Sequence, residues 1–145
     1  MDKLKTENIT LLQQLIKTHN QLMQKRLNMH GVYRGQHFVL FYLNDHPGVS
    51  SSELAQQFGI SKASLGSTIA RMENNGLLIR EVDNNDARRH LLYITEIGKE
   101  VATKCFEQVK QVQDMLFSQF DQDDQIKANE LFRKMINGLL EMESD

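Results

Sequence analysis

Polar and basic side chains gather on one face of the segment from residue 61 to residue 72. Over the same residues Leu65, Ile69 and Met72 are spaced by four and three, which places them together on the buried face of one helix. The opposite face carries hydroxyl groups, an ammonium and a guanidinium, which suit phosphates and base edges in the DNA major groove. We therefore predict a DNA-reading helix that acts through Ser61, Lys62, Ser64, Ser67, Thr68 and Arg71.

Two adjacent arginines, Arg88 and Arg89, lie in the polar stretch 83–90, DNNDARRH. This stretch is too long for a two-residue hairpin and too polar to be buried, so we expect an exposed loop between two strands. Asp86 lies two residues before Arg88, and its carboxylate could hold that side chain by a charge-assisted hydrogen bond. An arginine oriented in this way can enter a narrow minor groove, where the potential is most negative. Away from a DNA-binding helix, the same arginines would be interpreted as a solvated loop tip.

Two short helices and two strands are needed to position these side chains. Ser50 stands three residues before Glu53, which is the spacing of a capping box that opens a helix. Gly59 ends that helix, because glycine reaches positive φ without steric cost. The apolar stretches 78–82 and 91–94 suit strands on either side of the polar loop. Together these elements predict a helix-turn-helix with a wing, an arrangement that binds DNA.

Gly66 lies on the exposed face of the second predicted helix. Glycine costs a helix interior about 1 kcal/mol relative to alanine, so its presence calls for an explanation. One explanation is that a DNA backbone comes close to this spot, and the other is that glycine relieves crowding against a neighbouring helix. The residues themselves do not distinguish the two.

The segment 50–98 resembles the DNA-binding region of the MarR family of bacterial transcriptional regulators. In the wing of that family an acidic residue, any residue and an arginine precede a hydrophobic strand that ends in Leu-Thr, and a glycine follows. The matching residues are Asp86, Arg88, Ile94, Thr95 and Gly98. Two positions depart from the pattern: Ile94 replaces the usual leucine, and Ala87 stands where an arginine is common. The alanine at position 87 predicts that the wing binds DNA less tightly.

Length and composition fit one domain or one protomer. The 145 residues are 40% hydrophobic, which is enough to build a core. No apolar run is long enough to cross a bilayer, and no signal-like segment opens the chain, so we expect a cytoplasmic protein. The single cysteine excludes an intramolecular disulfide and suits a reducing compartment.

The net charge of −2 does not by itself favour a nucleic-acid partner, but the charge is unevenly distributed. Residues 1–35 carry six Lys and Arg against two Asp and Glu, whereas residues 107–145 carry four against nine. We expect the amino-terminal half and the wing to face the duplex and the acidic end to face away. The modest basic charge predicts dependence on two DNA-binding units that act together.

The predicted fold is mainly α, of the α+β winged helix-turn-helix type, with long dimerisation helices at both termini. Residues 1–30 and 121–145 are assigned to dimerisation, 35–95 to the winged helix and 96–120 to a long connecting helix. Their apolar faces exceed what one small winged helix can cover, which predicts an isologous homodimer. The resemblance implies the same, because MarR-like proteins dimerise through these helices. Such a dimer would bind a palindromic operator with half-sites about 34 Å apart. The alternative to the dimer is a monomeric bundle that packs its own core.

The resemblance also implies control by an effector, because members of the family respond to small phenolic or lipophilic ligands, to metals or to oxidants. We expect a repressor that a small ligand releases from DNA. A cleft between the dimer helices and the winged helix could be bordered by Met23, His30, Tyr33, His37, Phe38 and Phe41. These side chains mix apolar walls with a few polar groups, as ligand pockets do. The alternative is that the phenylalanines are core and the histidines are surface.

The residues give less support to other classes of function. None of the five histidines is paired at i, i+4 spacing, and Cys105 has no thiol partner nearby in sequence. Cys105 lies among apolar residues, so we expect an inert buried thiol and no bound metal or cofactor. No phosphate loop, nucleophile elbow or paired acid-base signature indicates an enzyme. A metal- or redox-responsive regulator, or a winged helix that binds proteins instead of DNA, remains the alternative.

Overall fold

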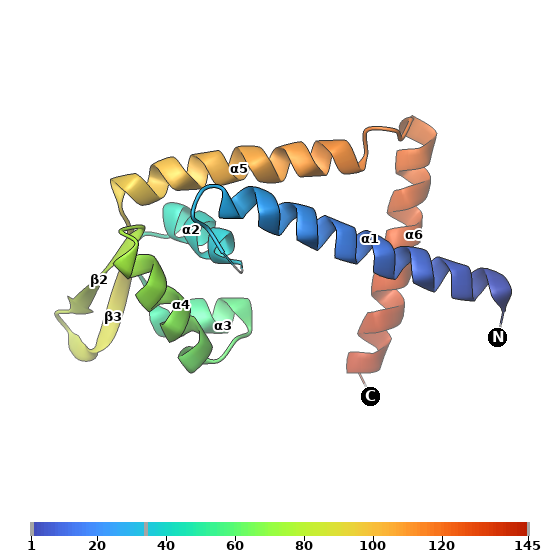
Figure 1. Ribbon diagram of the computed structural model, residues 1–145. Helices are drawn as coiled ribbons and strands as arrows, with labels where there is room; N and C mark the ends of the chain where they lie inside the picture. Colours follow the sequence, from blue (N-terminus) through green and yellow to red (C-terminus); the bar gives the residue numbers. More distant parts are fainter. Residues whose placement is uncertain (1, 34, 145) are drawn as a thin grey trace. The chain divides into compact units, whose positions relative to one another are not determined.

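The computed structural model describes residues 2–33 and 35–144 and divides into two compact units, one ending at Val109 and the other beginning at Lys110 (Figure 1). The helices are α1 (Lys3–Asn28), α2 (Gln36–Asp45), α3 (Ser51–Phe58), α4 (Lys62–Asn74), α5 (Glu96–Leu116) and α6 (Gln122–Glu143). The strands are β1 (Val49–Ser50), β2 (Leu78–Asp83) and β3 (Asp86–Ile94), which form one antiparallel sheet in the order β1-β3-β2. The prediction of a mainly α winged helix-turn-helix is therefore confirmed.

The first helix of the helix-turn-helix, α3, begins with the predicted capping box. The Ser50 hydroxyl accepts from the Glu53 backbone N–H, and Glu53 Oε2 accepts from the Ser50 backbone N–H, both at 3.1 Å. These two bonds satisfy donors that the first turn of a helix otherwise leaves without partners. Gly59 ends the helix with a φ of 62°, and Leu54 is completely buried beneath it. Local sequence signals thus determine both ends of α3.

The second helix, α4, is held on the core by one face. Leu65, Ile69 and Met72 are buried as their spacing predicted, and they pack with residues of α2, α3 and β3 in one hydrophobic core. The Ser61 hydroxyl accepts from the Ser64 backbone N–H at 3.1 Å and caps the first turn. The opposite face of α4 is consequently left available for other contacts.

The wing differs from the predicted loop. Strands β2 and β3 pair as far as Asp83 and Asp86, so that only residues 84–85 connect them. Arg88 and Arg89 therefore lie on β3 and not in a loop. The prediction of a long loop was wrong because it located the strands by their apolar residues alone. A projecting two-stranded ribbon is exposed on both faces, and its pairing depends on backbone hydrogen bonds instead.

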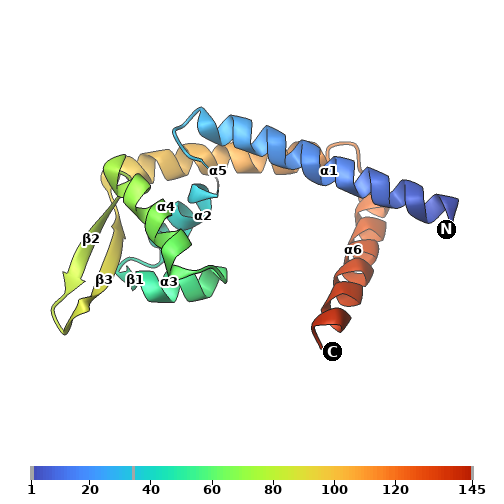
Figure 2. The same cartoon turned by 60° about the horizontal axis from the view of Figure 1, so that its bottom comes forward.

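The shortest strand, β1, was not predicted because two residues show no periodicity. Val49 pairs with Leu92 and Ser50 with Leu91, which adds β1 to the base of the wing. Figure 2 shows β1 beside α3, and Ser50 is both the end of β1 and the N-cap of α3. The wing and the first helix of the helix-turn-helix are thus joined through a single residue.

Gly98 shows why a glycine stands after the wing. It lies in the first turn of α5 against the backbone of Leu77, so a Cβ would overlap the Leu77 carbonyl oxygen and would meet Ile94 Cγ1 at 2.7 Å. The Gly98 N–H donates to Thr95 Oγ1 at 2.9 Å, and that hydroxyl donates to the Gly76 carbonyl at 2.5 Å. The Thr-Gly pair therefore fixes α5 against the turn that follows α4.

The second unit contains α6, which begins with another capping box, formed by Asp121 and Asp124. Its apolar side chains are not covered within the described chain: Leu131, Phe132, Met135, Ile136, Leu139 and Leu140 are each between 44% and 68% exposed. The amino-terminal part of α1, in the first unit, carries a similar exposed apolar face that includes Leu11, Leu15 and Ile16. Each terminal helix therefore presents apolar surface that the rest of its own unit does not cover.

We expect the substitution Gly98→Ala to destabilise the fold, because the added methyl group must displace the Leu77 backbone. Overpacking of this kind costs about 1–3 kcal/mol, and sometimes more. Gly66→Ala is the matched control, since a Cβ at Gly66 meets no described atom within 4 Å. Urea denaturation should show a lower midpoint for Gly98→Ala and a raised or unchanged midpoint for Gly66→Ala. Equal midpoints in the two variants would contradict the packing role of Gly98.

Candidate nucleic-acid interface

The six side chains predicted to read DNA all lie on α4 or at its N-cap. Five of them are exposed, and Thr68 is half-buried. Three hydroxyls already take part in local bonds, because Ser61 Oγ donates to Ser64 Oγ at 3.0 Å and Thr68 Oγ1 donates to the Ser64 carbonyl at 3.2 Å. Within residues 2–33 and 35–144, the side chains without such a bond are Lys62, Ser67 and Arg71. These three retain their donors for an outside partner.

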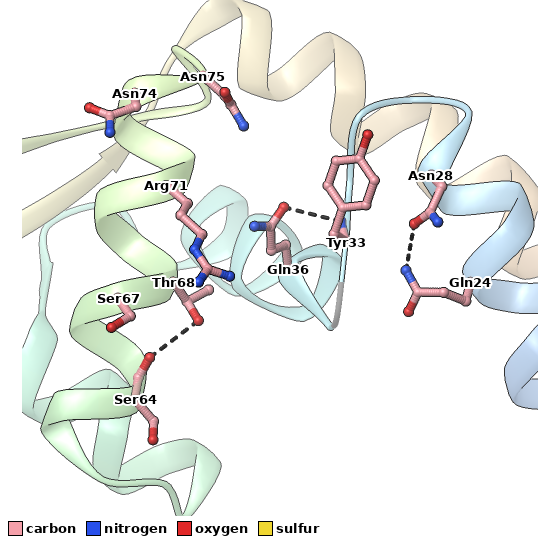
Figure 3. A pocket seen from close by; sticks show the side chains of 10 residues that line it. All are labelled: Gln24, Asn28, Tyr33, Gln36, Ser64, Ser67, Thr68, Arg71, Asn74 and Asn75. Carbon is pink, nitrogen blue, oxygen red and sulfur yellow. Dashed lines mark hydrogen bonds between the residues drawn. The ribbon is translucent and has the colours of Figure 1, made fainter.

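A polar cavity of about 960 Å³ lies between α4 and the α1–α2 region of the first unit (Figure 3). Figure 3 shows the Arg71 guanidinium extending from α4 toward Gln36 of α2. Arg71 is the only cation among the described residues that line it, which are Gln24, Asn28, Tyr33, Gln36, Ser64, Ser67, Thr68, Arg71, Asn74 and Asn75. The polar face of α4 therefore forms one wall of this cavity as well as an exposed surface.

The two wing arginines have different surroundings. Asp86 Oδ1 accepts from the backbone N–H of Arg88 at 3.0 Å, so this carboxylate shapes the start of β3 and does not hold the Arg88 guanidinium as predicted. The Arg88 side chain is exposed, and none of the carboxylates in the described part of the chain is within ion-pair distance of it. Arg89 Nη2, in contrast, lies 2.7 Å from Glu53 Oε1. Arg88 is thus the free cation of the pair.

A second ion pair, which sequence reasoning missed, joins α4 to the wing. Arg80 of β2 contacts Glu73 of α4 through Nη2 at 2.8 Å and through Nε at 3.3 Å to both carboxylate oxygens. The hydrogen bond from Arg80 holds the pKa of the Glu73 carboxyl below its ordinary value. A bidentate pair fixes direction as well as distance, so it orients β2 relative to the end of α4. The only sequence signal was an opposite charge seven residues away, across the turn at Gly76.

The six residues predicted to border a ligand cleft are only partly brought together. His37, Phe38 and Phe41 are in ring contact, with the His37 centroid 4.0 Å from Phe38 and 5.8 Å from Phe41. Tyr33 lines the polar cavity instead, and Phe38 also lines a shallow apolar groove of about 490 Å³. Met23 and Phe41 pack against the core, and His30 is half-buried.

His37 itself is 8% exposed, and its Nδ1 is buried without a hydrogen-bond partner in the described chain. Burial lowers the pKa of this imidazole, so the ring is neutral at physiological pH.

Cys105 is completely buried in the core of the first unit. Burial raises the pKa of its thiol to about 11, which leaves very little of the reactive thiolate at neutral pH. Over the described residues, no group of three His, Cys, Asp or Glu side chains is arranged to hold a metal ion. Likewise, none of the described helices is both long and apolar enough to span a bilayer.

Comparison with known sequences places the winged helix in a family. A sequence model described as the MarR family matches residues 30–89. The transcriptional regulator HosA of Escherichia coli O127:H6 is 30% identical over 126 residues, which cover 87% of this chain and 92% of HosA. The chain belongs to the MarR family. It is therefore a winged-helix transcriptional regulator, and the predicted family is confirmed.

Solved structures of the MarR fold agree with the architecture of the chain. The Streptomyces coelicolor regulator PcaV, solved in complex with its natural ligand, has a TM-score of 0.74 at 22% identity and covers 94% of this chain and 96% of its own. The S. aureus MepR–DNA complex has a TM-score of 0.77 at 19% identity, with 89% and 96% covered. At these identities the likeness concerns the fold.

One of the two explanations for a glycine at position 66 can be tested against the structure. A Cβ built at this position meets no atom of the described chain within 4 Å, so crowding against a neighbouring helix is not its cause. The close approach of DNA to α4 stays a prediction. Gly66→Ala should then leave the protein as stable or more stable, by up to about 1 kcal/mol, because alanine favours the helix.

We expect the same variant to bind DNA less tightly, since its methyl group occupies space that the duplex needs. Fluorescence anisotropy with a labelled operator duplex, together with a denaturation curve, measures both quantities. A Gly66→Ala protein with full DNA affinity would remove Gly66 from the interface.

Proposed function

We propose that this MarR-family protein is a repressor that binds a palindromic operator as a homodimer and is released by a small molecule. The observation that carries the proposal is the exposed polar face of α4 beside a wing whose Arg88 has no described ion-pair partner. A helix of this kind enters the major groove, and a projecting cation on the wing reaches the minor groove or the backbone.

The residues of α4 divide into two proposed roles. Lys62, Ser67 and Arg71 have no described partner for their side-chain donors, so we assign them to base edges and phosphates. An arginine can bind the O6 and N7 atoms of guanine together, which discriminates against the wrong base by about 1–3 kcal/mol. Ser64 and Thr68 are engaged within the helix and contribute mainly through their shape and their remaining lone pairs.

The homodimer is proposed from the apolar surface of the terminal helices. Fully burying one Leu, Ile, Phe or Met side chain is worth about 1.5–3 kcal/mol, and α6 exposes eight such residues. Soluble monomers rarely leave an apolar face of this extent in water. A second copy of the chain is the partner that every protomer has available, and an isologous interface would cover the same face on both.

The polar cavity is the proposed effector site. Its wall includes Thr68 and Arg71, so a molecule bound there contacts the same helix face that we assign to DNA. Effector and operator would then compete for Arg71, which is a direct form of coupling between two ligands. The described lining favours a small molecule that accepts hydrogen bonds, because amides, hydroxyls and the Arg71 guanidinium supply donors. Tyr33 is the residue that this site shares with the cleft expected from the sequence.

DNA binding by the wing is tested with Arg88→Ala and the intergenic DNA upstream of the protein's own gene. We expect lower affinity for every duplex and a salt dependence that is shallower by about one phosphate contact, because Arg88 supplies charge and not base recognition. Lys104→Ala is the matched control, since Lys104 is an exposed cation on α5 outside the winged helix. Anisotropy titrations at several salt concentrations measure both effects.

If the DNA affinity of Arg88→Ala depended on salt concentration as steeply as that of wild type, the wing would have no part in DNA binding. A folded wild-type dimer that binds no duplex at all would favour a protein-interaction module instead.

The dimer is tested with Leu139→Asp, which places a charge on the exposed apolar face of α6. Leu139 is 68% exposed, so the change leaves the packing of the protomer intact but should disrupt an interface. Asn137→Asp introduces the same side chain at an exposed polar position of α6 and is the control. Light scattering should give twice 16.8 kDa for wild type and for the control, and a lower mass for Leu139→Asp.

Deleting residues 121–145 should abolish operator binding, because two unlinked winged helices lose the effective concentration that a dimer supplies. A wild-type monomer at micromolar concentration that still binds the operator tightly would contradict the dimer.

A further inference from the structure

Arg89 lies between two carboxylates that come from distant parts of the winged helix. Its Nη2 is 2.7 Å from Oε1 of Glu53, at the start of α3, and its Nε is 3.9 Å from Oδ2 of Asp83, at the end of β2. Glu53 precedes Arg89 by 36 residues, so this contact exists only in the folded protein. One guanidinium thus links the wing to the first helix of the helix-turn-helix.

Both carboxylates are already oriented by the backbone. Glu53 accepts from the Ser50 N–H through Oε2 and from Arg89 through Oε1. Asp83 accepts from the Asn85 N–H through Oδ1 at 2.9 Å, which leaves Oδ2 for Arg89. Each carboxylate therefore holds a local turn with one oxygen and faces the guanidinium with the other.

The local charge argues against a direct contact between Arg89 and DNA. If this guanidinium turned toward a phosphate, two carboxylates would be left near the duplex without a cation. Arg88, the preceding residue on β3, has no described carboxylate partner and can meet a phosphate without that loss. Neighbouring residues of a strand point to opposite sides, so the two arginines are suited to different tasks.

We propose that Arg89 is a positioning residue that holds the wing against α3 through Glu53 and Asp83, so that Arg88 is presented to the duplex. This inference rests on the proposed DNA-binding function and replaces a direct contact between Arg89 and DNA. It predicts that the Glu53 carboxylate promotes DNA binding, although a negative charge near DNA alone would oppose it.

The decisive variant is Glu53→Gln. Glutamine still accepts from the Ser50 N–H and preserves the capping box, but it lacks the charge that attracts Arg89. If Arg89 is a positioning residue, Glu53→Gln should weaken operator binding two- to fivefold, the range expected for an exposed ion pair. If Arg89 contacts DNA itself, the same change frees the guanidinium, removes a negative charge and tightens binding. The two mechanisms therefore predict opposite signs.

Glu81→Gln is the matched control, because Glu81 is an exposed wing carboxylate on β2 without a described ion pair. It makes the same change of charge and should bind DNA as tightly as wild type, or more tightly. The double variant Glu53→Gln/Arg89→Ala should be no weaker than Arg89→Ala alone, since both changes break one contact. Additive losses in the double variant, or tighter binding by Glu53→Gln, would overturn the proposal.

Hydrogen exchange of the backbone amides of residues 83–90 tests the same contact in protein without DNA. Glu53→Gln and Arg89→Ala should speed exchange in the wing, whereas Arg88→Ala should not. Unchanged exchange in the first two variants would show that Arg89 does not hold the wing. This measurement keeps the inference separate from the proposed function, because it gives an answer even if the wild-type protein binds no DNA.

Discussion

The capping box at Ser50 and Glu53 is the interaction on which the winged helix depends. Ser50 ends β1, pairs with Leu91 of β3 and caps α3 with its hydroxyl. Glu53 completes the cap with one carboxylate oxygen and contacts Arg89 of the wing with the other. Four backbone and side-chain groups within one helical turn thus set the start of α3 and the base of the wing together. The backbone N–H of Ser50, aided by the Arg89 guanidinium, also holds the pKa of the Glu53 carboxyl below its ordinary value.

The wing is held at its other side by a second ion pair of the same kind. Arg80 contacts Glu73 at the end of α4, while Arg89 contacts Glu53 at the start of α3. Each strand of the ribbon is therefore tied to a different helix of the helix-turn-helix. Exposed ion pairs contribute little to global stability, usually below about 1 kcal/mol. Their effect here is geometric, because a ribbon without a core of its own has few other contacts that define its direction.

The polar face of α4 is both exposed and part of a cavity wall, and our proposal for regulation rests on this double position. The outward side is open, and the other side forms a wall of the 960 Å³ cavity that Gln36 and Tyr33 also line. Arg71 belongs to both. If the protein is the ligand-released repressor that we propose, no long-range pathway between effector and operator is needed, because one side chain could meet either ligand but not both at once.

The sequence by itself determined the local structure of the helix-turn-helix and the family of the chain. The spacing of Leu65, Ile69 and Met72, the Ser50–Glu53 cap and the Asp-x-Arg wing motif act over a few residues, so they can be identified without a fold. The tertiary structure alone decided the wing register and the separate surroundings of Arg88 and Arg89. It also decided which polar residues share the cavity. These features join segments that are distant in sequence, such as Glu53 and Arg89, which are 36 residues apart. An exposed ribbon or a polar cavity also leaves no apolar periodicity in the sequence.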